Sequence, residues 1–445
     1  MSKGKELLKK HEDDMWRCSR CSLCKFPPLA QIKSAKFYSS CCSIDYGNFH
    51  PWSGGGKLVM GFSLLLDRVK DISENMRDAI LQCTMCGACD VSCKYSTNIE
   101  LEEAIFDLRQ YMVETIGPHP VHKKYADAAE EFHNPYGEPH EKRQEWINNT
   151  SAKSNPEAKT MFFTGCTAAY RQQDMVKASV EILNILGFKF QLSKDEHCCG
   201  SPIYRTGQVE TAKKYFNHAI ELFNDAGIEE VITACPGCYA MFVAEYPKYL
   251  DEEHLKMWES ITFVHMTKVI EQGIRQKKIQ FKKLEKNPIV TYHDPCHLGR
   301  GAEPWVPEWK GTKKKVYNQI TIFDPPKEYR RGGKGVYDLP RFILDKMKTA
   351  LDFVEMFRIK EYAYCCGSGG GVKAAYPEMA LQTVDNRLEE ADHVLEEALE
   401  GKNLEKILVS ACPFCKTNFE NGLEASGRNI KYKDINQLVL EMMEK

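Results

Sequence analysis

The most informative feature of the sequence is a set of four cysteines between residues 83 and 93, spaced C-x2-C-x2-C-x3-C. Three cysteines at this spacing can bind one four-iron, four-sulfur cube, whereas the fourth cysteine of such a motif usually ligates a second cluster. One motif therefore predicts a partner motif. Upstream, a similar triplet is followed, after a delay, by two adjacent cysteines. The two sets are Cys83, Cys86, Cys89 and Cys93, and Cys18, Cys21, Cys24 and either Cys41 or Cys42.

The fourth ligand of the upstream set could be either of two adjacent cysteines, Cys41 or Cys42. In ferredoxin-type motifs the fourth cysteine directly precedes a proline, and Cys42 stands at that proline position. We therefore expect Cys41 to be the ligand and Cys42 to be the spare thiol. Because the fourth cysteines of two such motifs exchange clusters, Cys93 should complete the upstream triplet, and Cys41 should complete the triplet that begins at Cys83.

Ten further cysteines fall into two sets that share one order: a single cysteine, an adjacent pair followed by glycine, and a C-x2-C unit. The first set is Cys166, Cys198, Cys199, Cys235 and Cys238, and the second is Cys296, Cys365, Cys366, Cys412 and Cys415. Such a repeat is difficult to obtain from core cysteines scattered at random. We therefore expect two more metal sites, one in each half of the C-terminal region.

Disulfides and zinc are the rival explanations for 19 cysteines. Disulfide scaffolds are short secreted chains, whereas this chain has 445 residues and an odd number of thiols. Zinc suits the C-x2-C units. It does not suit the adjacent pairs at Cys198 and Cys365, which zinc ribbons do not normally use. The spacing therefore favours iron–sulfur clusters.

Composition narrows the class of protein further. The net charge of −2 argues against a general nucleic-acid or anionic-membrane surface. No apolar run reaches the roughly 18 residues that a membrane-spanning helix requires, and the chain opens with a lysine-rich run instead of an export signal. We expect a cytoplasmic protein that contacts the inner face of a membrane only through a partner, and that does not bind nucleic acid.

The N-terminal cysteines should be positioned by helices. Helical periodicity is expected over residues 2–16, 58–68, 72–81 and 99–112, with Gly117-Pro118 as a stop. The run Ser53-Gly54-Gly55-Gly56-Lys57 lacks the Ser or Thr that follows the lysine of a P-loop, so we interpret it as a turn before a helix. Residues 1–116 are thus predicted to form an α-helical domain with two clusters, followed by a linker over residues 117–158.

The C-terminal cysteines should instead follow strands. Short apolar runs at residues 160–163, 188–190 and 231–233 precede the first set, and runs at residues 288–292, 362–364 and 407–410 precede the second. Ligands at the carboxyl ends of strands are typical of α/β sheets. We predict an α/β fold with two pseudo-symmetric domains, 159–284 and 285–445. An insertion at about residues 303–339 is expected to be either a lid or a docking surface.

The order of these cysteines resembles the paired CCG domains of heterodisulfide reductase. With the two-cluster domain in front, the chain resembles the D subunit of that enzyme, over roughly residues 18 to 415. The motifs that carry the resemblance are Cys198-Cys199-Gly200-Ser201-Pro202, Asp294-Pro295-Cys296-His297-Leu298-Gly299 and Cys365-Cys366-Gly367-Ser368-Gly369-Gly370-Gly371.

The resemblance implies that each set of five cysteines holds a non-cubane four-iron cluster, in addition to the two cubane [4Fe-4S] clusters in front. It also implies that a disulfide is split where the two non-cubane clusters face each other, with Cys198, Cys199, Cys365 and Cys366 at the reaction. Gly200 and Gly367 would let the backbone approach the clusters. No nicotinamide or flavin motif is present, so the electrons must come from a partner: a flavoprotein, a membrane cytochrome or a catalytic subunit.

Three histidines adjoin the cysteines. His197 precedes the first pair, and His293 and His297 bracket Cys296. An imidazole at these positions could protonate a leaving thiolate, or it could hydrogen-bond cluster sulfur or backbone in a structural role. We take His197 and His297 as candidates for contact with a cluster, and the remote His254 and His393 as surface residues.

Two hypotheses remain open at this point. The chain is either a reductase whose own clusters cleave a disulfide, or an electron relay that binds a separate catalytic partner. Proteins built this way also serve in lactate or glycolate oxidation and in class II benzoyl-CoA reduction, so the motifs indicate the type of cluster and not the final acceptor.

Overall fold

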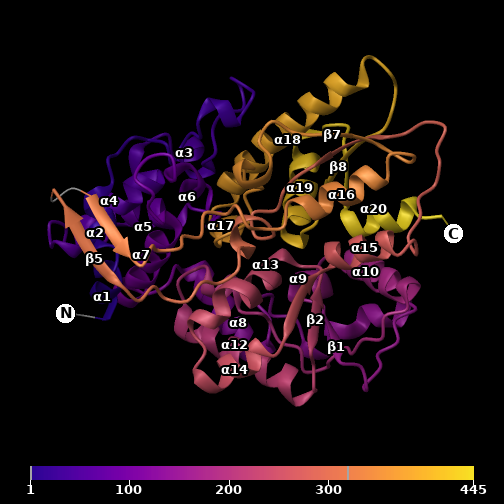
Figure 1. The fold of residues 1–445 in the computed structure, drawn as a ribbon, viewed down its shortest axis with the longest axis horizontal. Coiled ribbons are helices and arrows are strands. Elements are labelled where there is room, and N and C mark those ends of the chain that lie inside the picture. The colour runs from indigo at the N-terminus through magenta and orange to yellow at the C-terminus, as the bar shows by residue number, and fades with distance from the viewer. Residues whose placement is uncertain (1–2, 318–319, 445) are drawn as a thin grey trace.

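A computed structural model describes residues 3–317 and 320–444. The chain forms three lobes, an N-terminal helical lobe and two lobes that each contain a parallel sheet (Figure 1). The fold is thus α/β with a helical N-terminal part, as the sequence predicts. No helix of the described ranges combines the length and apolarity needed to cross a membrane.

The N-terminal lobe consists of short helices around one apolar core. Its longest helices pack together, with Leu8, Phe62 and Leu108 buried between them. The helices are α1 (Lys3–Lys9), α2 (Glu12–Arg17), α3 (Cys42–Gly47), α4 (Gly54–Leu65), α5 (Glu74–Leu81), α6 (Ala88–Cys93) and α7 (Leu101–Ile116). Short 3₁₀ turns span Leu29–Gln31 and His50–Trp52. The expected turn at the glycine run is instead the first turn of α4, capped by the Ser53 side chain, which accepts the N–H of Gly56 at 3.0 Å.

The segment between the lobes is ordered and largely helical. Helix α8 (Pro120–Phe132) is followed by a 3₁₀ segment, His140–Asn149. Helix α8 contacts both α11 (Ser201–Tyr204) and α17 (Val372–Ala375), which belong to different sheet lobes. This segment therefore packs on both of its sides.

The first sheet lobe has three parallel strands in the order β1 (Thr160–Phe163), β2 (Glu230–Thr233) and β3 (Thr262–His265). Besides α11, its helices are α9 (Cys166–Tyr170), α10 (Gln173–Leu186), α12 (Val209–Asp225), α13 (Pro236–Ala240), α14 (Glu252–Glu259) and α15 (Met266–Arg275), with a π-helical turn at Met241–Glu245 and a 3₁₀ turn at Tyr246–Lys248.

The second sheet lobe repeats this plan with an added edge strand. Its parallel order is β7 (Asp352–Val354), β4 (Ile289–Tyr292), β8 (Lys406–Ser410) and β9 (Lys431–Asp434). Besides α17, its helices are α16 (Asp338–Lys346), α18 (Pro377–Leu399), α19 (Pro413–Ser426) and α20 (Ile435–Met442), with 3₁₀ turns at Arg300–Ala302 and Lys360–Tyr362.

The two sheet lobes share one core. Helix α10 packs on α20, and α15 packs on α16, so that side chains such as Val180, Ile270, Ile343 and Leu438 are buried in a single apolar cluster. Figure 1 shows these four helices between the sheets. A shared core holds the two repeats rigidly against each other, because separating them would expose apolar surface to water.

Two predicted strands are wrong. Residues 188–190 form no strand, and only Gln191 makes an isolated parallel bridge to Met161. Residues 362–364 follow a 3₁₀ turn, and the actual edge strand is β7 at Asp352–Val354. Phe190, Ala363 and Tyr364 are buried without belonging to a ladder, and buried apolar residues give the same local pattern as a strand.

The insertion at about residues 303–339 extends toward the N-terminal lobe. It carries an antiparallel hairpin, β5 (Thr312–Val316) and β6 (Ile320–Asp324), which lies beside the N-terminal helices in Figure 1. The Lys313 ammonium is 3.1 Å from the Asp13 carboxylate, and Lys327 is 2.6 Å from Glu100. Of the two expected roles, the structure therefore supports a docking surface, and the surface contacted is the chain's own N-terminal lobe.

Candidate metal centres and the cleft between the repeats

The first candidate metal site lies at the surface of the N-terminal lobe. Burial raises the pKa of the Cys24 thiol, and the nearby Cys18, Cys93 and Cys21 raise it further, so these four thiols are neighbours. The backbone N–H of Gly55 donates to Cys24 Sγ at 3.4 Å, and the N–H of Ile99 donates to Cys93 Sγ at 3.4 Å. The structure therefore brings Cys93 to the upstream triplet, as expected for exchanged fourth ligands.

The glycines that begin α4 allow this helix to approach both cysteine sets. A Cβ atom at Gly55 would lie 3.6 Å from Cys24 Sγ and 3.8 Å from Cys18 Sγ, and one at Gly54 would lie 3.1 Å from Cys89 Cβ. A Cβ atom at Gly56 would lie 1.9 Å from the His50 carbonyl oxygen, which no side chain could accommodate. The positive end of the helix dipole thus faces the sulfurs and stabilises thiolate charge.

The second candidate site is a cavity of about 410 Å³ in the same lobe. The cysteines that line it are Cys41, Cys42, Cys83, Cys86 and Cys89. Burial raises the pKa of Cys41 to about 12, opposed by the nearby Lys57 ammonium. Lys57 is itself buried and donates to Ser43 Oγ at 3.0 Å. A buried cation beside the thiols favours their thiolate forms, which are the forms that bind metal.

Cys42 is not an isolated spare thiol. It is buried, lies 3.4 Å from Thr84 Oγ1, and hydrogen-bonds with Cys365 of the second sheet lobe. Cys86 hydrogen-bonds with Cys365 as well. Hydrogen bonds from Cys296, Cys366, Cys42 and Cys86 hold the pKa of Cys365 well below its usual range. The cysteines of the N-terminal cavity and those of the second repeat are thus in direct contact.

The two repeats arrange their five cysteines in the same way. In the first repeat, Cys198 hydrogen-bonds with Cys166, and Cys199 with Cys238. In the second, Cys365 hydrogen-bonds with Cys296, and Cys366 with Cys415. In each repeat, one member of the adjacent pair therefore contacts the first cysteine of the set and the other member contacts the last. The pair stands at the same place in the order of both sets because it makes the same two contacts.

Glycine after each pair is required by the backbone. Gly200 has φ +78° and Gly367 has φ +92°, a conformation that other residues rarely adopt. A Cβ atom would lie 2.8 Å from a Phe216 ring carbon at Gly200 and 2.8 Å from the Ala380 carbonyl oxygen at Gly367. The N–H groups of these glycines donate to Cys198 Sγ at 3.3 Å and to Cys365 Sγ at 3.4 Å. Each glycine thus turns its amide toward the sulfur.

A cavity with about 700 Å³ of empty space, part of it open to solvent, lies between the repeats. The second repeat contributes four cysteines to its wall, whereas the first contributes Ser201, Pro202 and Arg205. The cysteines that line it are Cys296, Cys366, Cys412 and Cys415. Tyr125 and Phe414 add aromatic surface. This cavity is called the cleft below.

Of the four thiols in the two adjacent pairs, only Cys366 lines the cleft, so the role of both pairs at the reaction stays a prediction. Cys198 and Cys199 do not line it, and the first repeat instead contributes Ser201 and Pro202 of helix α11 and Arg205. Cys365 points to the N-terminal lobe, and Cys366 alone of the four lines the cleft. In the second repeat, Cys365 thus faces the N-terminal lobe and Cys366 faces the cleft.

The candidate histidines lie in different surroundings. His297 lines the cleft, and burial, followed by the nearby Arg205, lowers its pKa to about 3. It is therefore neutral near pH 7 and has one N–H to donate. His197 lies outside the cleft, with its ring stacked between those of His133 and His218.

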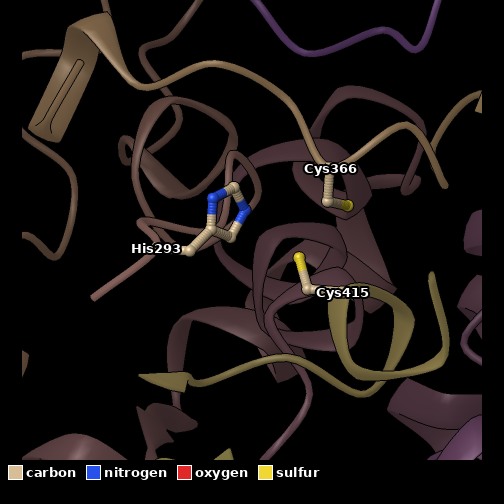
Figure 2. A group of neighbouring side chains, drawn as sticks. All are labelled: His293, Cys366 and Cys415. Carbon is tan, nitrogen blue, oxygen red and sulfur yellow. The ribbon is translucent and has the colours of Figure 1, made fainter. Parts of the chain in front are cut away.

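His293 is close to two cleft cysteines. One of its ring nitrogens and the sulfurs of Cys366 and Cys415 all lie within 4.8 Å of one another, and Figure 2 shows the three side chains converging. Arg387 Nε donates to His293 Nδ1 at 3.1 Å. Because arginine only donates, the proton of the neutral imidazole must be on Nε2, which has no partner within the described ranges. This N–H is free to donate to a sulfur.

Arg109 is absent from the residues that the sequence predicts to be functional, yet its buried guanidinium joins all three lobes. It donates to the carbonyl oxygens of Leu81 at 3.0 Å, Arg205 at 2.7 Å and Gly370 at 2.8 Å, and also to those of Ile80 and Cys83. An arginine within a helical pattern gives no sign in the sequence of such long-range contacts. Its place in the apolar periodicity of α7 indicates burial but does not identify the partners of the guanidinium.

The residues present fit iron–sulfur clusters. Burial raises the pKa of Cys41 and Cys89. For Cys86 a hydrogen bond with Cys365 raises the pKa most and burial adds to it, so that these thiols are poorly ionised without a cation nearby. Crowded buried thiols of this kind are stabilised when iron binds their thiolate forms. Backbone N–H groups already donate to sulfur in all four sets, including that of Ile44 to Cys41.

Comparisons with known proteins agree with this chemistry. The family described as the CCG cysteine-rich domain matches residues 160–243 and 329–420. The D subunit of dihydromethanophenazine:CoB–CoM heterodisulfide reductase from Methanosarcina mazei is 34% identical over 376 residues, covering 83% of this chain and 79% of the relative. The B subunit of fumarate reductase (CoM/CoB) from Methanothermobacter marburgensis is 29% identical, covering 84% and 63%, respectively.

A more distant relative is named as a quinone oxidoreductase and not as a CoM/CoB reductase subunit. The EtfAB:quinone oxidoreductase of Syntrophomonas wolfei is 26% identical, covering 82% of this chain and 47% of the relative. All three are oxidoreductases or subunits of them, and the cysteine sites described above are those of an iron–sulfur protein that transfers electrons. The chain belongs to the family of the heterodisulfide reductase D subunit and is an iron–sulfur oxidoreductase subunit.

Proposed function

We propose that this chain takes single electrons from a partner protein at its N-terminal lobe and uses two of them to split a disulfide in the cleft. The observation that carries the proposal is the position of the adjacent pair in the second repeat. Cys365 touches Cys42 and Cys86 of the N-terminal lobe, and Cys366 lines the cleft. Two neighbouring residues thus connect the N-terminal cysteines to the place where a substrate fits.

Two cubane and two non-cubane four-iron clusters are the proposed cofactors. Bound to the four cysteine sets, they would supply electrons one at a time. The ligands would be Cys18, Cys21, Cys24 and Cys93; Cys41, Cys83, Cys86 and Cys89; and the five cysteines of each repeat. Cys21 is the only exposed cysteine among the nineteen, all of which are described. This exposure favours its corner of the lobe as the docking place of a flavoprotein, a membrane cytochrome or another redox partner.

The residues that line the cleft are compatible with binding a disulfide and the thiols formed from it. Cleavage adds two electrons and two protons to the S–S bond and releases two thiols. Among the described residues, those that line the cleft include no carboxylate, and Arg205 is their one permanent cation, so no carboxylate there would repel an anionic substrate. The neutral His297 can donate a hydrogen bond to a thiolate, whereas the protons must come from solvent.

The test is anaerobic turnover by the full chain with an artificial electron donor and a panel of small disulfides that differ in charge. Product thiols at two electrons per disulfide support the proposal. An electron relay for a separate catalytic subunit is the alternative, and the name of the quinone oxidoreductase relative favours it. Cofactors that reduce and reoxidise without forming thiol, whichever disulfide is supplied, would establish the relay.

Iron content is the first prediction. With two clusters in the N-terminal lobe and two in the repeats, anaerobic protein should contain about sixteen irons and a similar amount of acid-labile sulfide per chain. Elemental analysis with sulfide determination measures both. Stoichiometric zinc bound by sulfur, with little labile sulfide, would exclude iron–sulfur clusters altogether.

Exchange of the fourth ligands is the second prediction. Cys93→Ala should alter the paramagnetic resonance signal of the site at Cys18, because the two belong to one group of neighbouring thiols, and it should leave the site at Cys83 intact. Loss of the Cys83 signal alone would contradict this. Cys41→Ser should disturb the Cys83 site more than Cys42→Ser does, and the reverse order would make Cys42 the ligand.

A further inference from the structure

Four histidines gather on the first repeat, outside the cleft. The His197 ring stacks between His133, at a centroid distance of 3.8 Å, and His218, at 3.7 Å. His140 meets His197 edge to face at 5.4 Å. Asp195, whose side chain is largely exposed, adds a carboxylate to the group. These residues come from three separate segments: the end of α8 and the 3₁₀ segment after it, the loop before Cys198, and helix α12.

The loop before Cys198 is held so that Asp195 and His197 point outward together. The residue between them, Glu196, points inward, where its carboxylate accepts the N–H groups of Thr164 and Gly165, each at 2.9 Å, and pairs with Arg143. Glu196 is buried. Because alternate residues of an extended segment face opposite sides, this anchor fixes the outward direction of its two neighbours.

The distances suit one small cation. The Nε2 atom of His197 is 3.5 Å from one oxygen of Asp195, and Nε2 of His218 is 3.8 Å from the other. One ligand atom from each of the three residues lies within 4.8 Å of the other two. In a tetrahedral zinc site with bonds of about 2.0–2.1 Å, ligand atoms are about 3.3 Å apart. The rings of His197 and His218 are stacked at an interplanar angle of 11°. Both rings would therefore have to turn about their side-chain bonds, as well as approach, for their nitrogen lone pairs to meet at one ion.

His140 is the candidate for a fourth ligand, because its ring meets that of His197 edge to face. His140 Nε2 lies 2.8 Å from the carbonyl oxygen of Lys194, so the ring proton is on Nε2 and Nδ1 carries a lone pair. That Nδ1 atom is buried and has no hydrogen-bond partner in the part of the chain that the structure describes. The carbonyl oxygen of Asp195 itself lies 2.9 Å from His218 Nε2, a contact that metal binding would replace.

We propose that Asp195, His197 and His218 bind one divalent transition-metal ion of the zinc class, with a water molecule or His140 in the fourth position. Imidazole and carboxylate ligands suit zinc and its first-row neighbours, whereas magnesium and calcium prefer oxygen. The site contains no thiol and is chemically distinct from the cysteine sets. It would clamp the loop that leads into Cys198 and Cys199 onto helix α12.

The second repeat has no such cluster among its described residues, although it positions its cysteine pair in the same way. There the residues before the pair are Ala363 and Tyr364. Tyr364 is buried, and its hydroxyl donates to the Asp45 carboxylate of the N-terminal lobe at 2.8 Å. The histidine cluster is therefore not needed to build a cysteine pair.

The experiment uses the full chain with its iron–sulfur clusters, purified anaerobically and titrated with Zn²⁺. Bound zinc is measured by equilibrium dialysis with elemental analysis, and its ligands by zinc K-edge absorption. We expect one zinc per chain, with only nitrogen and oxygen at about 2.0–2.1 Å. Asp195→Asn and His218→Gln should each weaken binding at least tenfold, and the double variant should bind no zinc at this site.

The matched control is His254→Gln. His254 is also a half-buried histidine with two carboxylates, Asp251 at 2.8 Å and Glu221 at 3.0 Å, but it is a single imidazole. Its replacement should leave zinc binding unchanged. Equal iron content in all variants shows that they are folded. Absence of zinc binding, sulfur ligands at about 2.3 Å, or undiminished binding by the double variant would each overturn the proposal and leave the imidazoles as stacked surface rings.

Discussion

Replacement of Cys366 by alanine should abolish disulfide cleavage by the full chain while leaving the resonance signals of the N-terminal lobe intact. Cys366 lines the cleft and hydrogen-bonds with Cys415, so its loss removes a proposed ligand at the substrate. Because removing even a partner of a metal ligand commonly costs about 10- to 100-fold in activity, losing the ligand itself should reduce turnover by more than about 100-fold. Steady-state turnover and low-temperature spectra measure the two effects.

Cys365→Ala and Cys198→Ala should have the same effect, the first by breaking the contact with Cys86 and the second by removing a ligand of the other repeat. The matched control is Cys42→Ala, which removes a thiol that touches the same Cys365 sulfur but is not a proposed ligand. This variant should retain most of the activity. Full turnover in the Cys366 and Cys198 variants would move the reaction away from the repeats.

The second large effect is expected for Arg109→Met. The side chain is fully buried, and its guanidinium donates to carbonyl oxygens of all three lobes. Methionine fills similar space but donates nothing, so the buried carbonyls of Leu81, Arg205 and Gly370 lose this donor. Since each unsatisfied buried group costs about 1–3 kcal/mol, we expect the free energy of unfolding to fall by about 3 kcal/mol or more. Anaerobic denaturant titration measures this.

Two further variants separate charge from packing. Arg109→Lys keeps the charge but loses the planar fork that reaches several carbonyls at once, and it should recover only part of the loss. Arg275→Met removes an exposed arginine that pairs with Glu271, and it should change stability by less than about 1 kcal/mol. If Arg109→Met were as stable as Arg275→Met, the lobes would be held together by their apolar contacts alone.

The sequence alone determined the ligand chemistry of this protein. Cysteines two or three residues apart chelate one metal site whatever surrounds them, because chelation at that spacing is local. The strands at Thr160–Phe163 and Ile289–Tyr292 were predictable from runs of apolar residues that are typical of buried parallel strands, whereas the shorter runs at 188–190 and 362–364 misled the same reasoning. The duplication of the five-cysteine set likewise predicted two lobes of one plan.

Only the tertiary structure decided which thiols meet. The contact of Cys365 with Cys42 and Cys86 joins segments that are far apart in sequence, and it depends on how the N-terminal lobe docks on the second repeat. Cys198 and Cys199 lie outside the cleft, although their sequence context and the positive φ of Gly200 match those of the other pair. His197 likewise faces the ring of His218 from helix α12 and not the cleft. Local spacing specifies what a side chain can bind, whereas packing between distant helices specifies what it faces, because only packing sets the direction in which each turn presents its residues.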